Sequence, residues 1–306
     1  MSAVSLRQLE YFVAAADTGS VTAAAARVFL SQSAVSTALA DLEESLGVQL
    51  FVRHARGLSL TSVGHQVLVD ARRLLSGVDD LQNSAREANE SLSGKLDVGC
   101  YSTLAPILLP RVISDFVAHH PAVDLRFVEG SYTQLVDLLR SGACDLALLY
   151  DYEFDQRRLP TDLAMHVLMS TPPYVVLPEH HPLSTLPGIS LGQLAAEPMI
   201  LFDLPPGGQY FLSLFEAEGL QPNIRFRTTS FEMVRALVAR GLGYSILSQR
   251  TGINVSYEGH GFVCRPLIGA PPGLSVGAVH LAGARLTRRA SAFIDQCRTS
   301  LAPATA

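Results

Sequence analysis

The first sixty residues contain three helix-length stretches in which apolar side chains recur every three or four positions. Each stretch follows a serine that can accept hydrogen bonds from the free amides of a helix amino terminus, namely Ser5, Ser20 and Ser31. Ser5 and Gln8 also form a capping-box pattern. The spacing predicts a first helix with the buried stripe Leu6, Leu9, Val13 and Ala16. It also predicts a second helix over 21–28 and a third over 32–46.

The third predicted helix separates apolar from polar side chains. Its expected apolar face consists of Val35, Leu39, Leu42 and Leu46. The opposite face, near the amino end, carries short polar groups that can reach base edges or phosphates in a DNA major groove: Gln32, Ser33, Ser36 and Thr37. This helix is therefore a candidate recognition helix.

Two short apolar runs after Gly47 flank the basic sequence Arg53-His54-Ala55-Arg56-Gly57. The pattern predicts a β-hairpin with a glycine in its turn. Arg53 and Arg56 can meet phosphates or a narrow minor groove. With the three helices, the hairpin predicts a winged helix-turn-helix DNA-binding domain over 1–60. The alternative is a generic helical bundle whose Ser, Thr and Gln side chains only cap and solvate helices.

Residues 61–93 contain no proline, and their apolar positions follow a heptad pattern. The pattern predicts a linker helix with the seam Val67, Ala71, Leu74, Val78, Leu81, Ala85, Ala88 and Leu92. On a lone helix this seam would be exposed, so we expect it to pair with a second subunit. The alternative is a helix packed on its own domain.

Charge supports the need for more than one subunit on DNA. Residues 1–94 hold seven arginines and ten acidic residues, and seven minus ten leaves a net charge of minus three. Attraction to DNA must therefore be local to the wing and the helix ends, and affinity is expected to depend on two or more such domains on one DNA.

From Lys95 onward, strand-like apolar runs alternate with helix-like stretches. The first set predicts strands over 96–100, 123–128 and 145–150 and helices over 107–119 and 132–141. The second predicts strands over 174–177, 199–202, 224–228 and 244–247 and helices over 209–218 and 231–240. A strand over 276–281 and a helix over 287–299 close the chain. The alternation predicts a doubly wound α/β domain over 94–306, built as two lobes of similar architecture.

In such a fold a ligand binds at the carboxyl ends of strands, between the lobes. The candidate effector-binding residues follow predicted strands: Ser102, Thr103, Gly130, Ser131, Tyr150, Asp151, Phe202, Asp203, Thr229 and Ser230. Ser102 and Thr103 precede a helix and would suit a carboxylate. The serines can equally well only cap helices.

Asp151 and Asp203 suggest which charge the ligand carries. Two acidic side chains at the cleft favour an amino or other cationic group over a plain dianion. Taken singly, each aspartate also fits a turn or capping role. The hypothesis is an amino compound or amino acid as effector.

The sequence LRQLEYFVAAADTGSVTAAAARVFLSQSAVSTALADLEESLGVQLFVR resembles the amino-terminal signature of LysR-type transcriptional regulators. The resemblance implies that Gln32, Ser36 and Arg53 contact DNA. It also implies dimers formed through the linker helix, commonly assembled into tetramers. The family typically has proline where Ser33 stands and often a basic or polar side chain where Thr37 stands, so the recognition helix departs from the pattern at two positions.

A second segment, MVRALVARGLGYSILSQ, resembles the effector domain of the same family. There Gly241 and Gly243 allow a tight helix-to-strand turn, and Ser248 stands where the family usually has proline. The resemblance further implies that residues 94–306 form an effector-binding domain with a periplasmic-binding-protein-like architecture, in which the last strand and helix return to lobe I. Lobe I then comprises about 95–167 and 268–301, and lobe II about 168–267.

Enzyme and metal chemistry are not expected. The sequence has no GxSxG, no GxGxxG after a strand and no GxxxxGK[ST]. Two histidine pairs each precede a proline, which places them in turns: His119-His120 and His180-His181. Without spaced partner ligands they predict no metal site, and no cofactor is expected beyond a small-molecule co-inducer.

The remaining features concern the compartment. The four cysteines are scattered without a CxxC pair, which predicts reduced core thiols, with redox sensing as a minor option: Cys100, Cys144, Cys264 and Cys297. A basic-then-apolar leader and an apolar run of about 18 residues are both lacking, which predicts neither a signal peptide nor a membrane span. We expect a cytoplasmic protein with no membrane partner.

Together the patterns predict a ligand-responsive regulator of LysR type. Its expected partners are double-stranded DNA, a small-molecule effector, further copies of the chain in a homodimer or homotetramer, and RNA polymerase. The alternative is a solute-binding or substrate-binding α/β protein that does not bind DNA and whose amino-terminal module serves only for assembly.

Overall fold

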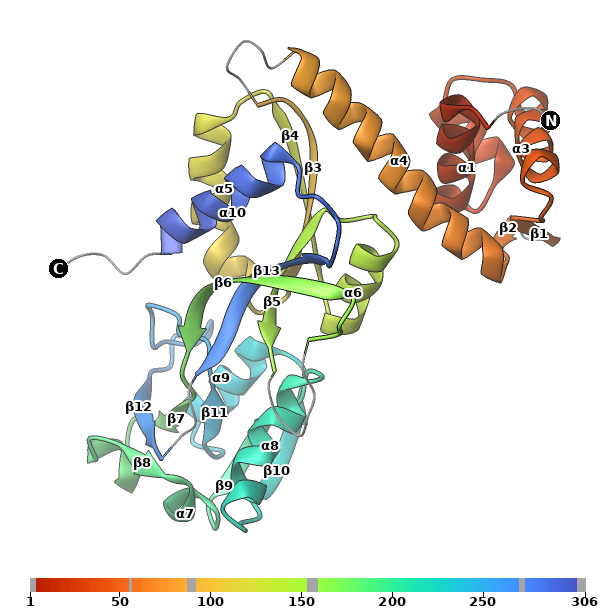
Figure 1. The fold of residues 1–306 in the computed structure, drawn as a ribbon. Coiled ribbons are helices and arrows are strands. Elements are labelled where there is room, and N and C mark those ends of the chain that lie inside the picture. Colours follow the sequence, from red (N-terminus) through yellow and green to blue (C-terminus); the bar gives the residue numbers. More distant parts are fainter. Residues whose placement is uncertain (1–3, 55–56, 87–91, 153–158, 270–272, 302–306) are drawn as a thin grey trace. The chain divides into compact units, whose positions relative to one another are not determined.

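The computed structural model describes residues 4–54, 57–86, 92–152, 159–269 and 273–301. The chain divides into two compact units. The first contains Met1–Leu96, His120–Asp124 and Asp137–Asp145, and the second contains the remaining residues. Figure 1 shows the elements of both units, coloured along the sequence.

The first unit begins with the three helices and the hairpin that the sequence predicts. They are α1 (Leu6–Thr18), α2 (Val21–Arg27), α3 (Gln32–Leu46), β1 (Phe51–His54) and β2 (Gly57–Leu60), with β1 and β2 antiparallel. Ser5, Ser20 and Ser31 each accept a hydrogen bond from a backbone amide in the first turn of their helix. Ser5 and Gln8 complete the capping box. Local capping therefore fixes where each helix begins.

One apolar core joins the helices of this unit. Its buried members are Leu9, Phe12, Ala14, Ala15, Ala24, Ala25, Val35, Leu39, Leu42, Leu50, Leu68 and Ala71. The buried stripe expected for α1 was therefore only partly right, because Leu6 is 44% exposed while Phe12 is fully buried. The reason is tertiary: α1 contacts α2, α3 and α4, and these three neighbours bury a broader and differently centred face than a single partner would.

The linker helix α4 (Ser62–Arg86) is shorter than the sequence predicts. Leu92 is not helical and β3 begins at Gly94, so the expectation of a helix to residue 93 was wrong. Ala88 lies outside the described residues. We call α1–α3 with the β1–β2 hairpin the head, and the hairpin its wing. Ala71 is buried in the core of the head and Val67 packs against that core, whereas Leu74 is 57% and Leu81 71% exposed. The first residues of the seam therefore pack on the core of their own chain, as in the alternative interpretation of a helix packed on its own domain. Leu74 and Leu81 remain exposed and available to a second subunit.

The larger sheet has five strands in the order β4-β3-β5-β13-β6. They are β3 (Gly94–Tyr101), β4 (Val123–Gly130), β5 (Leu146–Asp151), β6 (Leu163–Thr171) and β13 (Leu274–Leu281). β3 and β5 are parallel, while β13 is antiparallel to both β5 and β6. The sheet therefore contains both parallel and antiparallel pairs. The antiparallel pairs arise because β13, which comes near the end of the chain, lies between β5 and β6.

Three helices accompany this sheet: α5 (Ala105–His119), α6 (Tyr132–Arg140) and α10 (Arg288–Leu301). Helices α5 and α10 lie side by side (Figure 1), with the rings of Phe116 and Phe293 5.2 Å apart. The Ser300 hydroxyl donates to the Asp115 carboxylate at 2.8 Å. The last strand and helix therefore do return to the first lobe.

The second lobe has a four-stranded sheet in the order β11-β7-β12-β8 and a two-stranded sheet of β9 and β10. Its strands are β7 (Tyr174–Pro178), β8 (Ile189–Ser190), β9 (Pro198–Phe202), β10 (Asn223–Thr228), β11 (Ser245–Leu247) and β12 (Phe262–Ile268). Its helices are η2 (Pro182–Thr185), α7 (Leu191–Leu194), α8 (Gly207–Ala217) and α9 (Phe231–Ala239). Strands β9 and β10 are parallel, which brings the turns before α8 and α9 to the same edge.

A tight turn connects α9 to β11, as the two glycines predict. Gly241 has a φ of 79°, in the left-handed region. At Gly243 a side chain has no room, since a Cβ there would press into the carbonyl oxygen of Pro198. The close approach lets Tyr244 N donate to Pro198 O at 2.9 Å, and so ties the end of α9 to β9.

All four cysteines are free thiols, with Cys100, Cys144 and Cys297 buried. Burial raises the pKa of Cys297 to about 12 and that of Cys100 further, so neither is an activated thiolate. Among the described residues, no helix is both long enough and apolar enough to cross a membrane.

Candidate functional site

The polar face of α3 is open to solvent. Gln32, Ser33 and Thr37 are exposed and Ser36 is half-buried, while Val35 on the other side of the helix is buried. A helix that hides its apolar face in a core and presents short polar side chains near its amino end has the geometry of a major-groove reader. The four polar residues expected from the sequence therefore do share one accessible surface.

The wing lies beside this surface. Arg53, on β1, is exposed, and its Nη2 donates to the Ser36 hydroxyl of α3 at 3.4 Å. Arg56 lies outside the described residues. An exposed guanidinium next to the recognition helix can meet a phosphate or enter a minor groove while α3 occupies the adjacent major groove. We define Gln32, Ser33, Ser36, Thr37 and Arg53 as the reading surface.

Glu43 connects α3 to the wing. Its Oε1 accepts hydrogen bonds from the backbone amides of Leu50 at 2.7 Å and Phe51 at 3.1 Å, where β1 begins. The other strand of the wing is held by Leu58 N, which donates to Gly19 O at 2.8 Å. These bonds fix the direction in which the wing leaves the head, and with it the place of Arg53.

Replacing Glu43 with alanine is expected to lower the free energy of unfolding by about 1–3 kcal/mol, because two part-buried amides lose their acceptor. DNA affinity should also fall, since the wing loses its anchor. Urea unfolding and DNA titration would measure the two effects. Glu44→Ala, at the exposed neighbouring position, is the matched control and should change neither. An unchanged DNA affinity in Glu43→Ala would show that Glu43 does not position the wing.

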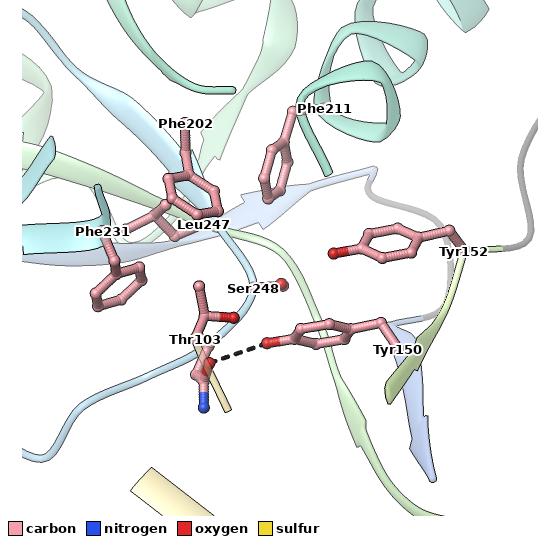
Figure 2. A pocket seen from close by; sticks show the side chains of 9 residues that line it. Thr103, Tyr150, Tyr152, Phe202, Phe211, Phe231, Leu247 and Ser248 are labelled. Atoms are coloured by element: carbon pink, nitrogen blue, oxygen red, sulfur yellow. Dashed lines mark hydrogen bonds between the residues drawn. The ribbon is translucent and has the colours of Figure 1, made fainter. Parts of the chain in front are cut away.

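A second candidate site is a narrow cavity in the second unit, part of it open to solvent. Its lining residues are Thr103, Tyr150, Tyr152, Phe202, Phe211, Phe231, Leu247, Ser248 and Gln249. Figure 2 shows the rings of Phe202, Phe211 and Phe231 on one side, and the hydroxyls of Tyr150 and Tyr152 directed inward from the other. The site is an aromatic pocket with a few polar groups, a typical composition for small-molecule binding.

Tyr150 is the centre of the polar groups. Its hydroxyl donates to Gln249 Oε1 at 3.0 Å, and Thr103 and Ser248 belong to the same lining. The backbone of Gln249 is also fixed, because its carbonyl oxygen accepts a hydrogen bond from the Tyr174 hydroxyl at 2.7 Å. The polar side of the cavity is therefore fixed before any ligand arrives.

The described lining residues carry no formal charge. Burial raises the pKa values of Tyr150 and Tyr152 above their ordinary range, so both hydroxyls stay protonated at neutral pH. Among the residues that the structure covers, no group of three or more His, Cys, Asp or Glu side chains could hold a metal ion. The described lining thus combines apolar rings with neutral hydrogen-bonding groups.

Three of the residues expected from the sequence lie in this lining: Thr103, Tyr150 and Phe202. Several others have partners of their own. The Ser102 amide and hydroxyl both donate to Gly130 O at 3.1 Å. Ser131 exchanges capping bonds with Gln134 on α6, and Ser230 caps α9 through Met233 N. Thr229 is exposed, and Asp151 is half-buried at the end of β5.

Asp203 does not face the cavity as an uncompensated charge. Its Oδ2 accepts from Arg227 Nη1 at 3.0 Å, and both side chains are partly exposed. Neither Asp203 nor Asp151 is among the residues that line the pocket. The acidic pair that suggested a cationic ligand is therefore not assembled at the cavity.

Sequence reasoning missed six lining residues: Tyr152, Phe211, Phe231, Leu247, Ser248 and Gln249. Some signals were available. Phe231 directly follows the capping serine of α9, and Ser248 is the position where the family's usual proline is absent. Phe211 lies one turn inside α8 and Gln249 two residues beyond β11. Their convergence depends on how the two lobes fold together, which periodicity does not report.

The chain matches two family models: a bacterial regulatory helix-turn-helix protein of the lysR family over residues 6–65, and a LysR substrate binding domain over residues 89–302. It is 34% identical to the uncharacterized HTH-type transcriptional regulator YnfL of Escherichia coli K12, over 80% of this chain and 82% of that protein.

Solved structures give the same result. HinK, a LysR family regulator from Pseudomonas aeruginosa, has 38% identity and a TM-score of 0.64, covering 97% of this chain and 98% of its own. A full-length OxyR variant from Pseudomonas aeruginosa has 26% identity and a TM-score of 0.78, covering 98% of this chain and 95% of its own. Both alignments span the head and the α/β unit, which argues against a generic helical bundle and against a solute-binding protein with a mere assembly module.

Proposed function

The chain belongs to the LysR family of bacterial DNA-binding transcriptional regulators, and we propose that it controls target promoters in response to a small molecule bound in the aromatic cavity. Proteins of this family are regulators, so the chain is a regulator and not an enzyme. The main observation in support of DNA binding is the hydrogen bond from Arg53 to Ser36, because it places the wing and the recognition helix on one reading surface.

The proposal assigns one task to each region. Residues 1–60 bind double-stranded DNA through the reading surface and Arg56. Residues 61–93 join subunits, and residues 94–306 bind the effector, with the first lobe near 95–167 and 268–301 and the second near 168–267. The regulator acts in the cytoplasm, where RNA polymerase is a further partner. Effector binding shifts the balance between arrangements of the paired heads.

Self-association is part of the proposal. Leu74 and Leu81 lie seven residues apart on one face of α4, and both are largely exposed in a single chain. Two apolar side chains in this spacing favour pairing with the same helix of a second copy, first as a homodimer and then as a homotetramer.

Replacing Leu74 and Leu81 with aspartate is expected to weaken self-association at least about tenfold, since burying each leucine is worth roughly 1.5–3 kcal/mol and a buried aspartate would oppose the contact. Sedimentation velocity over a concentration series measures the change. Gln66→Asp, on an exposed polar position of the same helix, is the control. If the double variant associates as tightly as the wild type, α4 is not the interface.

For the effector, an amino compound or amino acid is the class that the sequence suggests. Asp203 supports it less now that Arg227 neutralises its charge, but the aromatic faces of the lining could hold an ammonium group by cation–π attraction. A thermal-shift panel of amines, amino acids and simple organic acids tests the class. Stabilisation by the acids alone would exclude it.

The direct test of the function is capture of sheared genomic DNA from the source organism by the purified full-length protein at near-physiological salt. We expect a few sharp sites with imperfect dyads, whose neighbouring genes point to the effector. Uniform recovery that no candidate compound sharpens would contradict a promoter-specific regulator.

A further inference from the structure

Arg72, on the linker helix α4, connects two parts of the first unit. Its Nη2 pairs with the carboxylate of Asp17, near the end of α1 in the head. Its Nη1 donates to the backbone carbonyl of Ser141 at 2.7 Å. Ser141 directly follows α6, and the segment Asp137–Asp145 belongs to the same compact unit as the head. One side chain therefore joins the head to the end of α6.

This bridge is largely shielded from solvent. The side chain of Arg72 is 16% exposed and that of Asp17 is 24% exposed. Asp17 also pairs with Arg27 of α2 at 2.9 Å, but the side chain of Arg27 is 53% exposed. Salt and water screen a shielded ion pair less than an exposed one. Arg72 is therefore the stronger of the two ties to Asp17, and it is the one that also reaches α6.

The end of α6 is well suited to receive a cation. The turn after the helix is fixed by hydrogen bonds, among them Ala143 N to Leu138 O at 2.9 Å. The Ser141 carbonyl lies at the carboxyl end of the helix, where the helix dipole is negative. The two chain segments are also close-packed, since a Cβ added at Gly142 would lie 3.2 Å from Arg72 Cβ. Charge and packing together hold this turn against α4.

The other end of α6 contacts the cavity. The helix begins at Tyr132, whose ring is edge-to-face with the ring of Tyr152 at 6.5 Å. Tyr152 lines the cavity. Helix α6 has nine residues, a length of roughly 13 Å, and both Leu135 and Leu139 on its inner face are buried. Because so short a packed helix moves as one body, a displacement at Tyr132 also displaces the turn at Ser141.

We propose that Arg72 is a positioning residue for DNA binding, through which α6 holds the head, and that a change at Tyr152 reaches the head along α6 and Arg72. While Tyr152 keeps its place, Ser141 and Asp17 hold the guanidinium between them. An effector that displaces Tyr152 shifts α6, weakens the bond to Ser141 and frees the head to change its arrangement. The inference rests on the proposed function, because it names the route from the effector cavity to the DNA.

A double-mutant cycle on DNA affinity tests the route without any effector. Tyr152→Ala is the change at the cavity and Arg72→Met removes the bridge, while Arg27 still pairs with Asp17. Fluorescence anisotropy with a captured genomic site gives the affinity of the full-length wild type, both single variants and the double variant. We expect Tyr152→Ala to change the affinity at least about fivefold when Arg72 is present. In the Arg72→Met background the change should be less than about twofold, as for independent sites.

Three further variants separate this route from a merely structural role. Arg27→Met removes the other cation on Asp17 but keeps the bond to Ser141. Arg73→Met removes the same charge one residue along α4, where the pair with Asp70 is exposed. The effect of Tyr152→Ala should remain about fivefold in both backgrounds. Arg72→Lys keeps the charge without the fork of donors and should restore the effect only in part. A residue that only stabilises the head would lower the affinity by the same factor with and without Tyr152→Ala.

A fivefold effect that persists in Arg72→Met overturns the route, and so does a Tyr152→Ala variant that binds DNA as the wild type does. Neither result affects the proposed function, because the wild type still selects its site. A wild type that selects no genomic site contradicts the proposed function itself. Circular dichroism checks the fold of each variant. If Tyr152→Ala does not fold, Tyr132→Leu at the start of α6 takes its place with the same expected factors.

Discussion

Replacement of Arg53 with alanine should weaken binding to a specific DNA site by roughly 30-fold to 10⁴-fold. An arginine that contacts DNA contributes about 1–3 kcal/mol per head, and two heads on one site double the loss. The side chain is exposed beside Ser36, so its removal leaves the head core untouched. Fluorescence anisotropy with a captured genomic site measures the affinity.

Salt dependence shows what Arg53 touches. If it meets a phosphate, the slope of log affinity against log salt should fall by about one per head, and all sequences should weaken alike. If it enters the minor groove, discrimination between sites should fall instead. Arg73→Ala, an exposed arginine on α4, is the matched loss of charge. DNA binding that survives replacement of Arg53 and Arg56 together would show that the wing assignment is wrong.

The largest stability loss outside the head is expected for Arg235→Met. Arg235 is 7% exposed, and its guanidinium donates to Glu232 at 2.8 Å and to the carbonyls of Ile253 at 2.7 Å and Val255 at 2.8 Å. Removing it leaves Glu232 without its cation and frees the chain around 253–255. Breaking a buried pair in this way costs about 3–5 kcal/mol, or roughly 6–20 °C in Tm.

The same change should reach the ligand. The guanidinium lies 5.9 Å from the centre of the Phe231 ring, and Phe231 lines the cavity. Calorimetry of the full-length variant gives the stability, and thermal shifts with the panel of amines, amino acids and organic acids give the effect on ligand binding. Arg240→Met, at the end of the same helix, is the control, because its pair with Glu258 is exposed and should add little. Equal Tm values for the two variants would contradict a structural role for buried Arg235.

Most elements of the head could be predicted from short-range sequence patterns. Ser5, Ser20 and Ser31 start their helices because a capping hydroxyl acts within three residues of its own position. The strand and helix alternation after Gly94 was recognised for the same reason, since buried strands such as β5 are continuous apolar runs. Family resemblance added the roles of Gln32, Ser36 and Arg53 in DNA contact, which stay predictions until DNA is bound.

The errors came where a neighbour decided the outcome. Strand β6 has half-buried and exposed positions along its length, and β12 contains Pro266, so neither has the pattern of a buried strand. Both exist because β13 and β7 lie next to them and supply hydrogen-bond partners. Likewise the heptad seam of α4 is periodic throughout, yet its first turns pack on the head core, a competition that periodicity cannot reveal.

The sequence by itself indicated the family, the elements of the amino-terminal domain and the polar face of α3, because each depends on residues that are close together in the chain. The tertiary structure decided which side chains meet. It drew Asp203 to Arg227 and away from the cavity, and it brought Gln249 to Tyr150 across 99 positions of sequence. Contacts between residues so far apart depend on how the sheets and helices pack, and no local pattern encodes that packing.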